Sequence, residues 1–245
     1  PGITRLYNAT KLSGRTRENL GIGFFNALSV PMYARIQNLN TGKDSSILTE
    51  PLTNYNILVL DQALKNRSSV TFTNTNVLRK GNTRNANVSS LDISLFDRKN
   101  RYNLSLSGKY SAIWGKTANS NGYSTLANFG KVSGIIQYKA LLSVISDKYD
   151  PNDLGFIQNA NDFYYYGQIS YNKLKPTRYF LNHIYKISIG NHYLYKPFNW
   201  SSTQINASAF FLYKNFWDVT FQFQCSPSWT RDYFVNSSVY NGHFL

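Results

Sequence analysis

The sequence predicts an all-β fold, an antiparallel transmembrane β-barrel, and three observations support this. Polar and apolar residues alternate with period two over several long stretches, which gives a strand one apolar and one polar face. The clearest stretch covers residues 102–114. It is longer than the ~5–6 residues of a usual strand and long enough for a tilted membrane crossing. The polar faces carry small, mostly uncharged side chains, as the lumen of a membrane barrel does.

Taken in order, the pattern predicts about twelve strands near 3–12, 18–29, 52–64, 69–79, 88–97, 101–114, 121–131, 135–146, 162–173, 177–190, 201–213 and 217–229. Short turns are expected at one end of these strands, and longer loops at the other, including 30–51 and 147–161. The turn at Ser133-Gly134 divides what would otherwise be one overlong strand. Short turns alternating with longer loops are typical of membrane barrels.

Twelve crossings of alternating direction place both chain ends on the loop side. We expect further strands before Pro1 and after Trp229, the latter beginning within 233–245. An unpaired strand edge in hydrocarbon costs several kcal/mol for each unsatisfied N–H or C=O. We therefore expect residues 1–245 to be an outer-membrane β-barrel domain, incomplete at both ends, whose first and twelfth strands do not pair with each other.

The composition agrees with strands that are apolar on one side only. Hydrophobic residues make up 42% of the chain and the mean hydropathy is −0.37. No run approaches the ~18 apolar residues of a transmembrane helix. Aromatic residues make up 16% and gather at expected strand ends, where amphipathic rings favour the membrane interface. They are Trp114, Tyr149, Trp200 and Trp229 on the loop side, and Tyr102, Tyr171, Tyr179, Tyr213 and Trp217 on the turn side.

The net charge of +14 comes from basic residues at expected turns. No strand repeats Lys or Arg on one face to follow a phosphate backbone, so we expect no nucleic-acid partner. Basic turns suit lipid headgroups instead. The only cysteine, Cys225, lies on the apolar face of its strand and excludes an internal disulfide.

Side-chain parity divides each strand into a lipid-facing and a lumen-facing set. Leu106, Ala209 and Phe221 represent the lipid-facing set. The lumen-facing polar candidates are Asp92, Asn103, Ser105, Ser107, Lys109, Gln204, Asn206, Gln222 and Gln224.

An acidic loop offers the one weak candidate for a metal site. Its oxygen-bearing side chains are Asp147, Asp150, Asn152 and Asp153. Calcium takes such ligands, but the spacing is not that of an EF-hand. Pro151 and a positive φ at Gly155 instead favour a rigid turn capped by Asp150, Asn152 and Asp153. We expect no metal and no cofactor.

The histidines, His183, His192 and His243, show no spacing to a nucleophile and an acid that indicates hydrolysis. The sequence therefore favours a non-enzymatic protein without catalytic residues.

Three segments carry a family resemblance: "ATKLSGRTRENLGIGFFNALS" (9–29), "EPLTNYNILVLDQAL" (50–64) and "YDPNDLGF" (149–156). Together they resemble the outer-membrane β-barrel domain of unknown function that is common in Bacteroidota and often follows a carbohydrate-binding family-9-like module. The resemblance spans most of residues 1–230. It implies a barrel that continues beyond this chain, and it transfers no catalytic residues.

These observations lead to a non-enzymatic protein of the bacterial outer membrane, a channel or a structural subunit of a transport or assembly complex. The expected partners are outer-membrane lipid and lipopolysaccharide, with other outer-membrane complex subunits as a further class. Three alternatives remain open at this point: a soluble-facing, β-rich glycan-binding domain, an outer-membrane barrel hydrolase, and a nucleic-acid binder, which would show a salt-dependent affinity.

Overall fold

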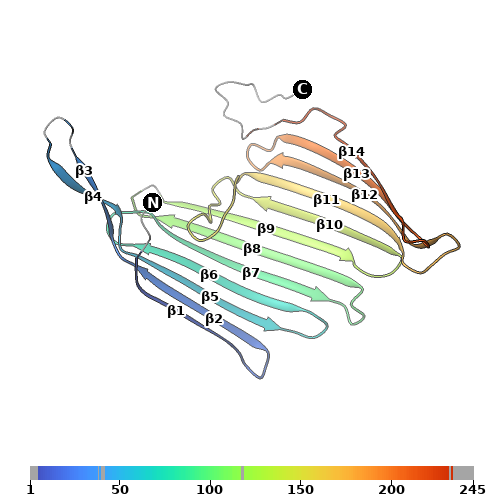
Figure 1. Ribbon diagram of the computed structural model, residues 1–245, viewed down its shortest axis with the longest axis horizontal. Coiled ribbons are helices and arrows are strands. Elements are labelled where there is room, and N and C mark those ends of the chain that lie inside the picture. The colour runs from blue at the N-terminus through green and yellow to red at the C-terminus, as the bar shows by residue number, and fades with distance from the viewer. Residues whose placement is uncertain (1–4, 38, 40–41, 117–118, 232, 234–245) are drawn as a thin grey trace.

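The computed structural model describes residues 5–37, 39, 42–116, 119–231 and 233. Within them the chain forms fourteen antiparallel strands, twelve of which build one sheet in the order β1-β2-β5-β6-β7-β8-β9-β10-β11-β12-β13-β14 (Figure 1). The first seven strands are β1 (Leu6–Arg15), β2 (Leu20–Ser29), β3 (Met32–Gln37), β4 (Asp44–Glu50), β5 (Thr53–Ala63), β6 (Ser69–Arg79) and β7 (Asn85–Phe96). The others are β8 (Tyr102–Trp114), β9 (Ser120–Lys131), β10 (Ile136–Ile145), β11 (Asp162–Lys173), β12 (Phe180–Leu194), β13 (Trp200–Tyr213) and β14 (Asp218–Cys225).

The structure confirms the all-β antiparallel prediction, and the twelve strands of the large sheet correspond to the twelve predicted ranges. Most strand ends agree with the predicted ranges to within three residues, and two differ by four. β12 continues to Leu194 rather than 190, and β14 ends at Cys225 rather than at 229. Pro227 has no N–H to give to a ladder, which favours an early end to β14. No helix in the described parts of the chain is long and apolar enough to cross a membrane.

The prediction of a loop without strands over residues 30–51 is wrong, because this segment contains the β3–β4 hairpin. The hairpin projects away from the large sheet (Figure 1) and is largely solvent-exposed. Its two strands pair only with each other within the described residues. β3 alternates only over Met32, Ala34 and Ile36, and β4 does not alternate, so the pattern that revealed the longer strands is weak here.

The connections alternate between two ends of the sheet, which we name the turn end and the loop end. The turn end holds the connections 16–19, 64–68, 97–101, 132–135, 174–179 and 214–217. Gly134 has a φ of 94° in the turn where it was predicted. The predicted contrast in length is weaker than expected, because β7 and β12 extend into their loops. The loops over 80–84 and 195–199 are shorter than the turn over 174–179.

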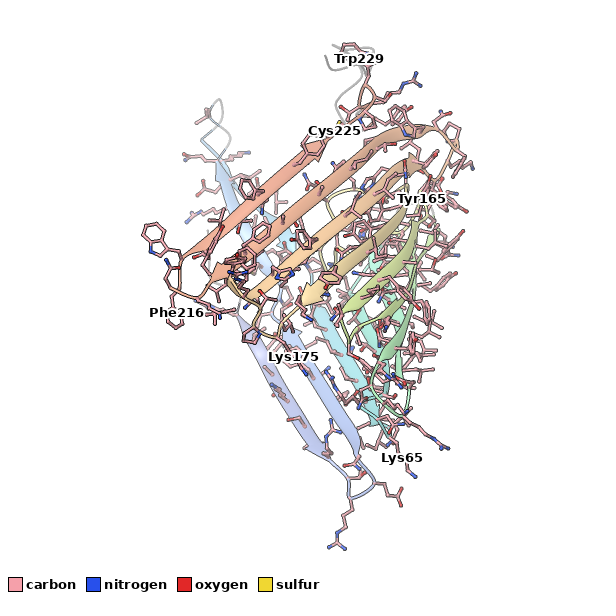
Figure 2. All side chains as sticks on the ribbon, turned by 90° about the vertical axis from the view of Figure 1, so that its right-hand side faces the viewer. Lys65, Tyr165, Lys175, Phe216, Cys225 and Trp229 are labelled. Atoms are coloured by element: carbon pink, nitrogen blue, oxygen red, sulfur yellow. The ribbon has the colours of Figure 1, made fainter. Side chains whose placement is uncertain are left out.

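The large sheet is curved and open. Figure 2 shows β11–β14 in front of β1 and β2, so the sheet bends back on itself. In the described chain β1 pairs only with β2, and β14 only with β13. The prediction that the first and twelfth strands do not pair is therefore confirmed, and this part of the chain is an open sheet rather than a closed barrel. The expected strand within 233–245 lies outside the described residues, apart from Tyr233.

The sheet has an inner and an outer face, which cross-strand register follows from strand to strand. The inner face is the one on which the loop over 146–161 folds. On the outer face Leu106 of β8 pairs with Ile93 and Ala127, and beyond them lie Leu142 and Tyr165. Exposed aliphatic side chains follow this face across the sheet: Ile22, Leu91, Leu106, Leu142, Ile169, Ile187 and Ile189. The sheet thus presents a broad apolar surface that no second layer of the described chain covers.

A small apolar core lies on the inner face near the loop end. It is a single row of paired residues across five strands: Ala27, Tyr55, Val77, Ala86 and Ile113. Four of them are buried, and Val77 is only 1% exposed. The residues next to this row in sequence point to the outer face, and they are Asn26, Asn56, Asn76 and Asn87. The polarity of the two faces is therefore reversed at the loop end of β2 and β5–β7.

Gly134 provides a test of this strand division. We expect Gly134→Ala to lower the free energy of unfolding by about 1–3 kcal/mol, because a side chain is strained at this φ. Chemical unfolding in detergent measures it. Gly14→Ala is the control, since a Cβ there has nothing within 4 Å and no strained φ. Equal effects of the two substitutions would contradict the assignment.

Candidate functional site

The inner face brings together the residues predicted to line a lumen. Asp92, Asn103, Ser105, Ser107 and Lys109 lie on neighbouring strands β7 and β8, where Asp92 pairs with Ser107. Gln204 and Asn206 lie on β13, and Gln222 and Gln224 lie on β14, where Gln224 pairs with Asn206. Register across the intervening strands connects the two groups through Ser107, Leu126, Ser143, Tyr164, His192 and Ser202. All the predicted lumen residues therefore share one face of one sheet.

Hydrogen bonds along the inner face order part of this polar surface. The Ser105 hydroxyl donates to Asn103 Oδ1 at 2.9 Å, and Asn103 Nδ2 donates to Ser94 Oγ at 3.3 Å. The Ser90 hydroxyl donates to Asp92 Oδ2 at 3.2 Å. Asn103 is buried, whereas Lys109 and the glutamines of β14 are exposed. The surface is hydrophilic and is built from strands rather than mobile loops.

The acidic loop between β10 and β11 folds onto the inner face. The Asp150 N–H donates to Ser111 Oγ at 3.1 Å, and Tyr149 is 6% exposed. The loop backbone passes so close to β9 that a Cβ at Gly122 would lie 2.2 Å from the Tyr149 nitrogen. Ser111 and Gly122 stand beside the apolar row at Ile113, so the loop lies at the loop end, beside the small core.

Two arginines hold this loop in place. Arg79 Nη1 lies 2.8 Å from Asp153 Oδ1, and Arg84 Nη2 lies 2.8 Å from both Asp153 Oδ2 and Asp150 Oδ2. The Asp153 side chain is only 7% exposed, so both of its oxygens are paired away from bulk water. A desolvated carboxylate requires such compensation.

The ion pairs also shift the protonation equilibria of loop residues. Burial alone would raise the pKa of Asp150, but hydrogen bonds from Arg84 and the Asn152 N–H outweigh it and lower that pKa below its usual value. Burial likewise opposes the charge on Arg84, yet its bonds to Asp153 and Asp150 raise the pKa of the guanidinium. Burial raises the pKa of the Tyr149 hydroxyl. Asp150 and Arg84 are thus charged at neutral pH.

The weak metal candidates separate into different roles. Asp150 and Asp153 face arginines, and Asn152 Oδ1 accepts the Ile157 N–H at 2.7 Å. Asp147 has no ion pair among the described residues, which also include no cluster of three or more His, Cys, Asp or Glu able to hold a metal.

The predicted turn forms, with one correction. Gly155 does not have the predicted positive φ. Glycine is suited to this position because a Cβ would lie 3.0 Å from the Pro151 carbonyl oxygen, which accepts the Gly155 N–H at 2.8 Å.

Two histidines fall within the described residues, and His243 lies outside them. His192 Nδ1 is 3.2 Å from Asp162 Oδ1, and its ring stacks on Tyr164 at 4.1 Å between centroids. No hydrogen bond in the described chain joins His192 to a serine, threonine or cysteine. His183 lies on the outer face among Tyr171, Phe180 and Tyr185.

Sequence reasoning missed Arg79 and Arg84 because they lie far from the acidic loop along the chain. The available signal was Gly122, a glycine inside a strand pattern, which often marks close backbone approach. A second omission is the outer-face amide network. Asn26 Nδ2 donates to the Oδ1 atoms of Asn54 and Asn56 at 2.6 and 2.7 Å.

The aromatic side chains of the outer face form two rows. The turn-end row includes Tyr102 stacked on Phe129, and the Phe180, Tyr185, Phe211 and Phe221 cluster. The loop-end row includes Phe163, Tyr165, Tyr193 and Phe198, and Tyr123, whose hydroxyl lies 2.6 Å from that of Tyr195. Between the rows the outer face is mainly aliphatic.

These features define a class of protein: an antiparallel β-sheet domain with an apolar band on its outer face and, over β7–β14, a mainly polar inner face. The chain matches the family described as Domain of unknown function (DUF5916) over residues 1–244, and it belongs to that family. No curated protein and no solved structure matches the chain.

Gly122→Ala tests the docking of the loop. We expect the new Cβ to displace the loop backbone, because no flexible side chain is available to move aside. Trypsin should then cut after Lys148 faster than in the wild type, as mass spectrometry of the fragments would show. Gly108→Ala on β8 is the matched control, because a Cβ there meets nothing within 4 Å. Unchanged cleavage in Gly122→Ala would contradict the close approach.

The ion pairs predict how acid affects docking. The contribution of Asp150 is complete above the unfolded-state pKa of about 3.9 and is lost as the pH falls through its lower folded-state pKa. Pepsin should therefore cleave within 146–161 only in strongly acidic solution. Asp153→Asn should make the loop sensitive at higher pH, whereas Asp147→Asn should not. A loop already sensitive in mildly acidic solution would argue against the arginine clamp.

Proposed function

We propose that this chain is a non-enzymatic outer-membrane β-barrel domain, acting as a channel or as a structural subunit of an outer-membrane transport or assembly complex. The observation that carries the proposal is the exposed aliphatic band of the outer face opposite a polar inner face. A soluble monomer rarely exposes a contiguous apolar patch of more than a few hundred Å². Lipid is the environment in which such a face is stable, and a water-filled lumen suits the other.

The two aromatic rows support a membrane-spanning orientation. In β8, Tyr102 and Tyr110 of the outer face stand at opposite ends of the aliphatic band. At about 3.3 Å per residue they are about 26 Å apart along the strand. At the ~40° tilt of membrane barrels this becomes about 20 Å along the normal, close to the ~25 Å apolar band between their aromatic girdles.

The two ends of the sheet suit interfaces of different character. At the loop end of β2 and β5–β7, outer-face asparagines lie opposite an apolar row on the inner face, the arrangement expected of a sheet that stands in water. The turn end combines exposed Leu174, Tyr179, Phe216 and Trp217 with an excess of cations. Its Lys and Arg residues are Arg15, Arg17, Lys65, Arg67, Arg98, Lys99, Arg101, Lys131, Lys173, Lys175, Arg178 and Lys214, against Glu18, Asp61, Asp97 and Asp218. Basic and aromatic side chains together favour lipid headgroups.

The open edges β1 and β14 require partners in a membrane. Every residue of β1 is exposed, and unpaired backbone groups are costly in hydrocarbon. We propose that further strands flank both edges and close a larger barrel. Following the sequence resemblance, we propose that such a barrel lies in the outer membrane of a member of the Bacteroidota, with lipid and lipopolysaccharide around it and other complex subunits as further neighbours.

Two alternatives are less well supported. A glycan-binding domain would use aromatic platforms beside polar groups, and the inner face has Tyr164 and Tyr166 beside Gln168. Glycan binding leaves the exposed aliphatic side chains of the outer face, such as Leu106, Leu142 and Ile187, without a role. A barrel hydrolase would use the His192–Asp162 pair, but no nucleophile of the described chain bonds to His192.

Fractionation and bilayer recording test the proposal. The full-length protein should stay in the membrane through an alkaline carbonate wash, and its gel mobility should change on heating as a folded barrel's does. Purified protein in a planar bilayer should then show conductance if it is a channel. Recovery as a soluble, detergent-free monomer would contradict the membrane assignment. Membrane retention without conductance would favour the structural subunit.

Paired arginine substitutions test which face meets lipid. Leu106→Arg should cost about 2–4 kcal/mol of folding free energy in a bilayer, because arginine is poorly solvated in hydrocarbon. Ser105→Arg on the inner face should cost much less. Phe221→Arg and Gln222→Arg form a second pair on β14. Equal costs within each pair, measured by reversible unfolding in lipid vesicles, would overturn the assignment of faces.

A further inference from the structure

The inner face of β8–β14 carries cations in mid-strand and carboxylates only at strand ends. Lys109, Lys139 and Lys186 lie within β8, β10 and β12, on the same face as the polar lumen candidates. The inner-face carboxylates of these strands are Asp162, which begins β11 at the loop end, and Asp218, which begins β14 at the turn end. The middle of this surface is therefore positive.

These three lysines keep their charge available. Each is exposed, and none takes part in an ion pair of the described chain. Of the other inner-face cations, Arg15 lies 2.8 Å from Asp61 and Arg79 lies 2.8 Å from Asp153, whereas Lys11 of β1 has no ion pair among the described residues. Asp162 is itself adjacent to His192. Three of the unpaired inner-face lysines thus lie on β8–β14, where the carboxylates are confined to strand ends.

Lys109 lies diagonally across the β7–β8 ladder from Asp92, whereas the cross-strand partners of Lys139 and Lys186 include no acid. Lys139 pairs across the ladder with Gln168, and its Nζ lies 5.9 Å from the centre of the Tyr166 ring. Lys186 pairs with Ser170 and Ser208. Ammonium, amide and hydroxyl groups all donate hydrogen bonds. A surface of donors with unpaired positive charge suits negatively charged solutes.

We propose that the inner face of β8–β14 is an anion-binding surface, so that the lumen which it lines selects anionic solutes. This inference rests on the proposed membrane barrel and names its solute class. Clefts lined by one sign of charge and bounded by a low-dielectric wall focus the field and concentrate counter-ions. Rings of charged side chains set selectivity in pores by the same means.

Reversal potentials in a planar bilayer test the inference on the full-length protein. Under a gradient of KCl, the wild type should show a zero-current potential of the sign expected for chloride preference. The double variant Lys139→Glu/Lys186→Glu should shift it toward potassium. Lys131→Glu/Lys173→Glu is the matched control, because these two lysines stand at the turn end on the outer face. Potassium preference in the wild type, or equal shifts in both variants, would overturn the inference.

A protein that does not conduct would contradict the proposed channel but not the proposed anion-binding surface. A binding measurement then tests the surface directly. Detergent-purified protein is titrated with pyranine, a trisulfonated fluorescent dye. Lys139→Glu/Lys186→Glu should bind it about tenfold more weakly at low salt, with the difference shrinking as salt screens the charges. Lys139→Gln/Lys186→Gln is the second variant if charge reversal prevents folding. Undiminished binding in the inner-face variants, or an equal loss in the turn-end control, would contradict the proposal.

Discussion

The unbroken antiparallel ladder from β1 to β14 is the constraint on which the other features depend. Paired residues share a face, so the register fixes the side of every side chain through twelve strands. A slip by one residue in β8 would move Leu106 to the inner face and Ser107 to the outer one. In the described part of the chain the sheet is a single layer, and no second sheet buries its apolar side. The environment must cover that side, and the proposal of a lipid-facing surface follows from this requirement.

Alternation along the chain was clearest in β7, β8, β13 and β14, because their two faces differ in polarity, whereas β5 carries Ile57, Leu58, Val59 and Leu60 in succession. The alternating stretch over 102–114 has the same bounds as the observed β8. The same reasoning missed the β3–β4 hairpin, because the alternation of β3 covers only six residues and β4 does not alternate. It also extended β14 to 229, although Pro227 argues for an earlier end. The curvature of the sheet and its two unpaired edges depend on how the strands are arranged in space. From the sequence, only the direction of each strand could be predicted.

The candidate site shows a similar division. The lumen-facing residues follow from parity, since Ser105 and Gln222 differ from Leu106 and Phe221 only by one position along a strand. The docked loop does not follow from local pattern, because Arg79 and Arg84 are separated from Asp150 and Asp153 by more than sixty residues. The reversal of the two faces at the loop end has the same origin. The apolar row through Val77 is buried at the end where the loop docks, and Asn56 and Asn76 then occupy the outer face. A residue's preference for one face therefore depends on what covers that face.

The central claim is that the outer face contacts lipid while the inner face contacts water. Spin labels placed at each position of 102–114, on a protein with Cys225→Ser and reconstituted in vesicles, test it most directly. Collision rates with oxygen, which concentrates in hydrocarbon, should be high at Leu104 and Leu106. Collision rates with a water-soluble nickel complex should be high at Ser105 and Ser107. Period-two alternation of opposite phase for the two reagents is the predicted result. Access of the nickel complex to both sets of positions would contradict the account.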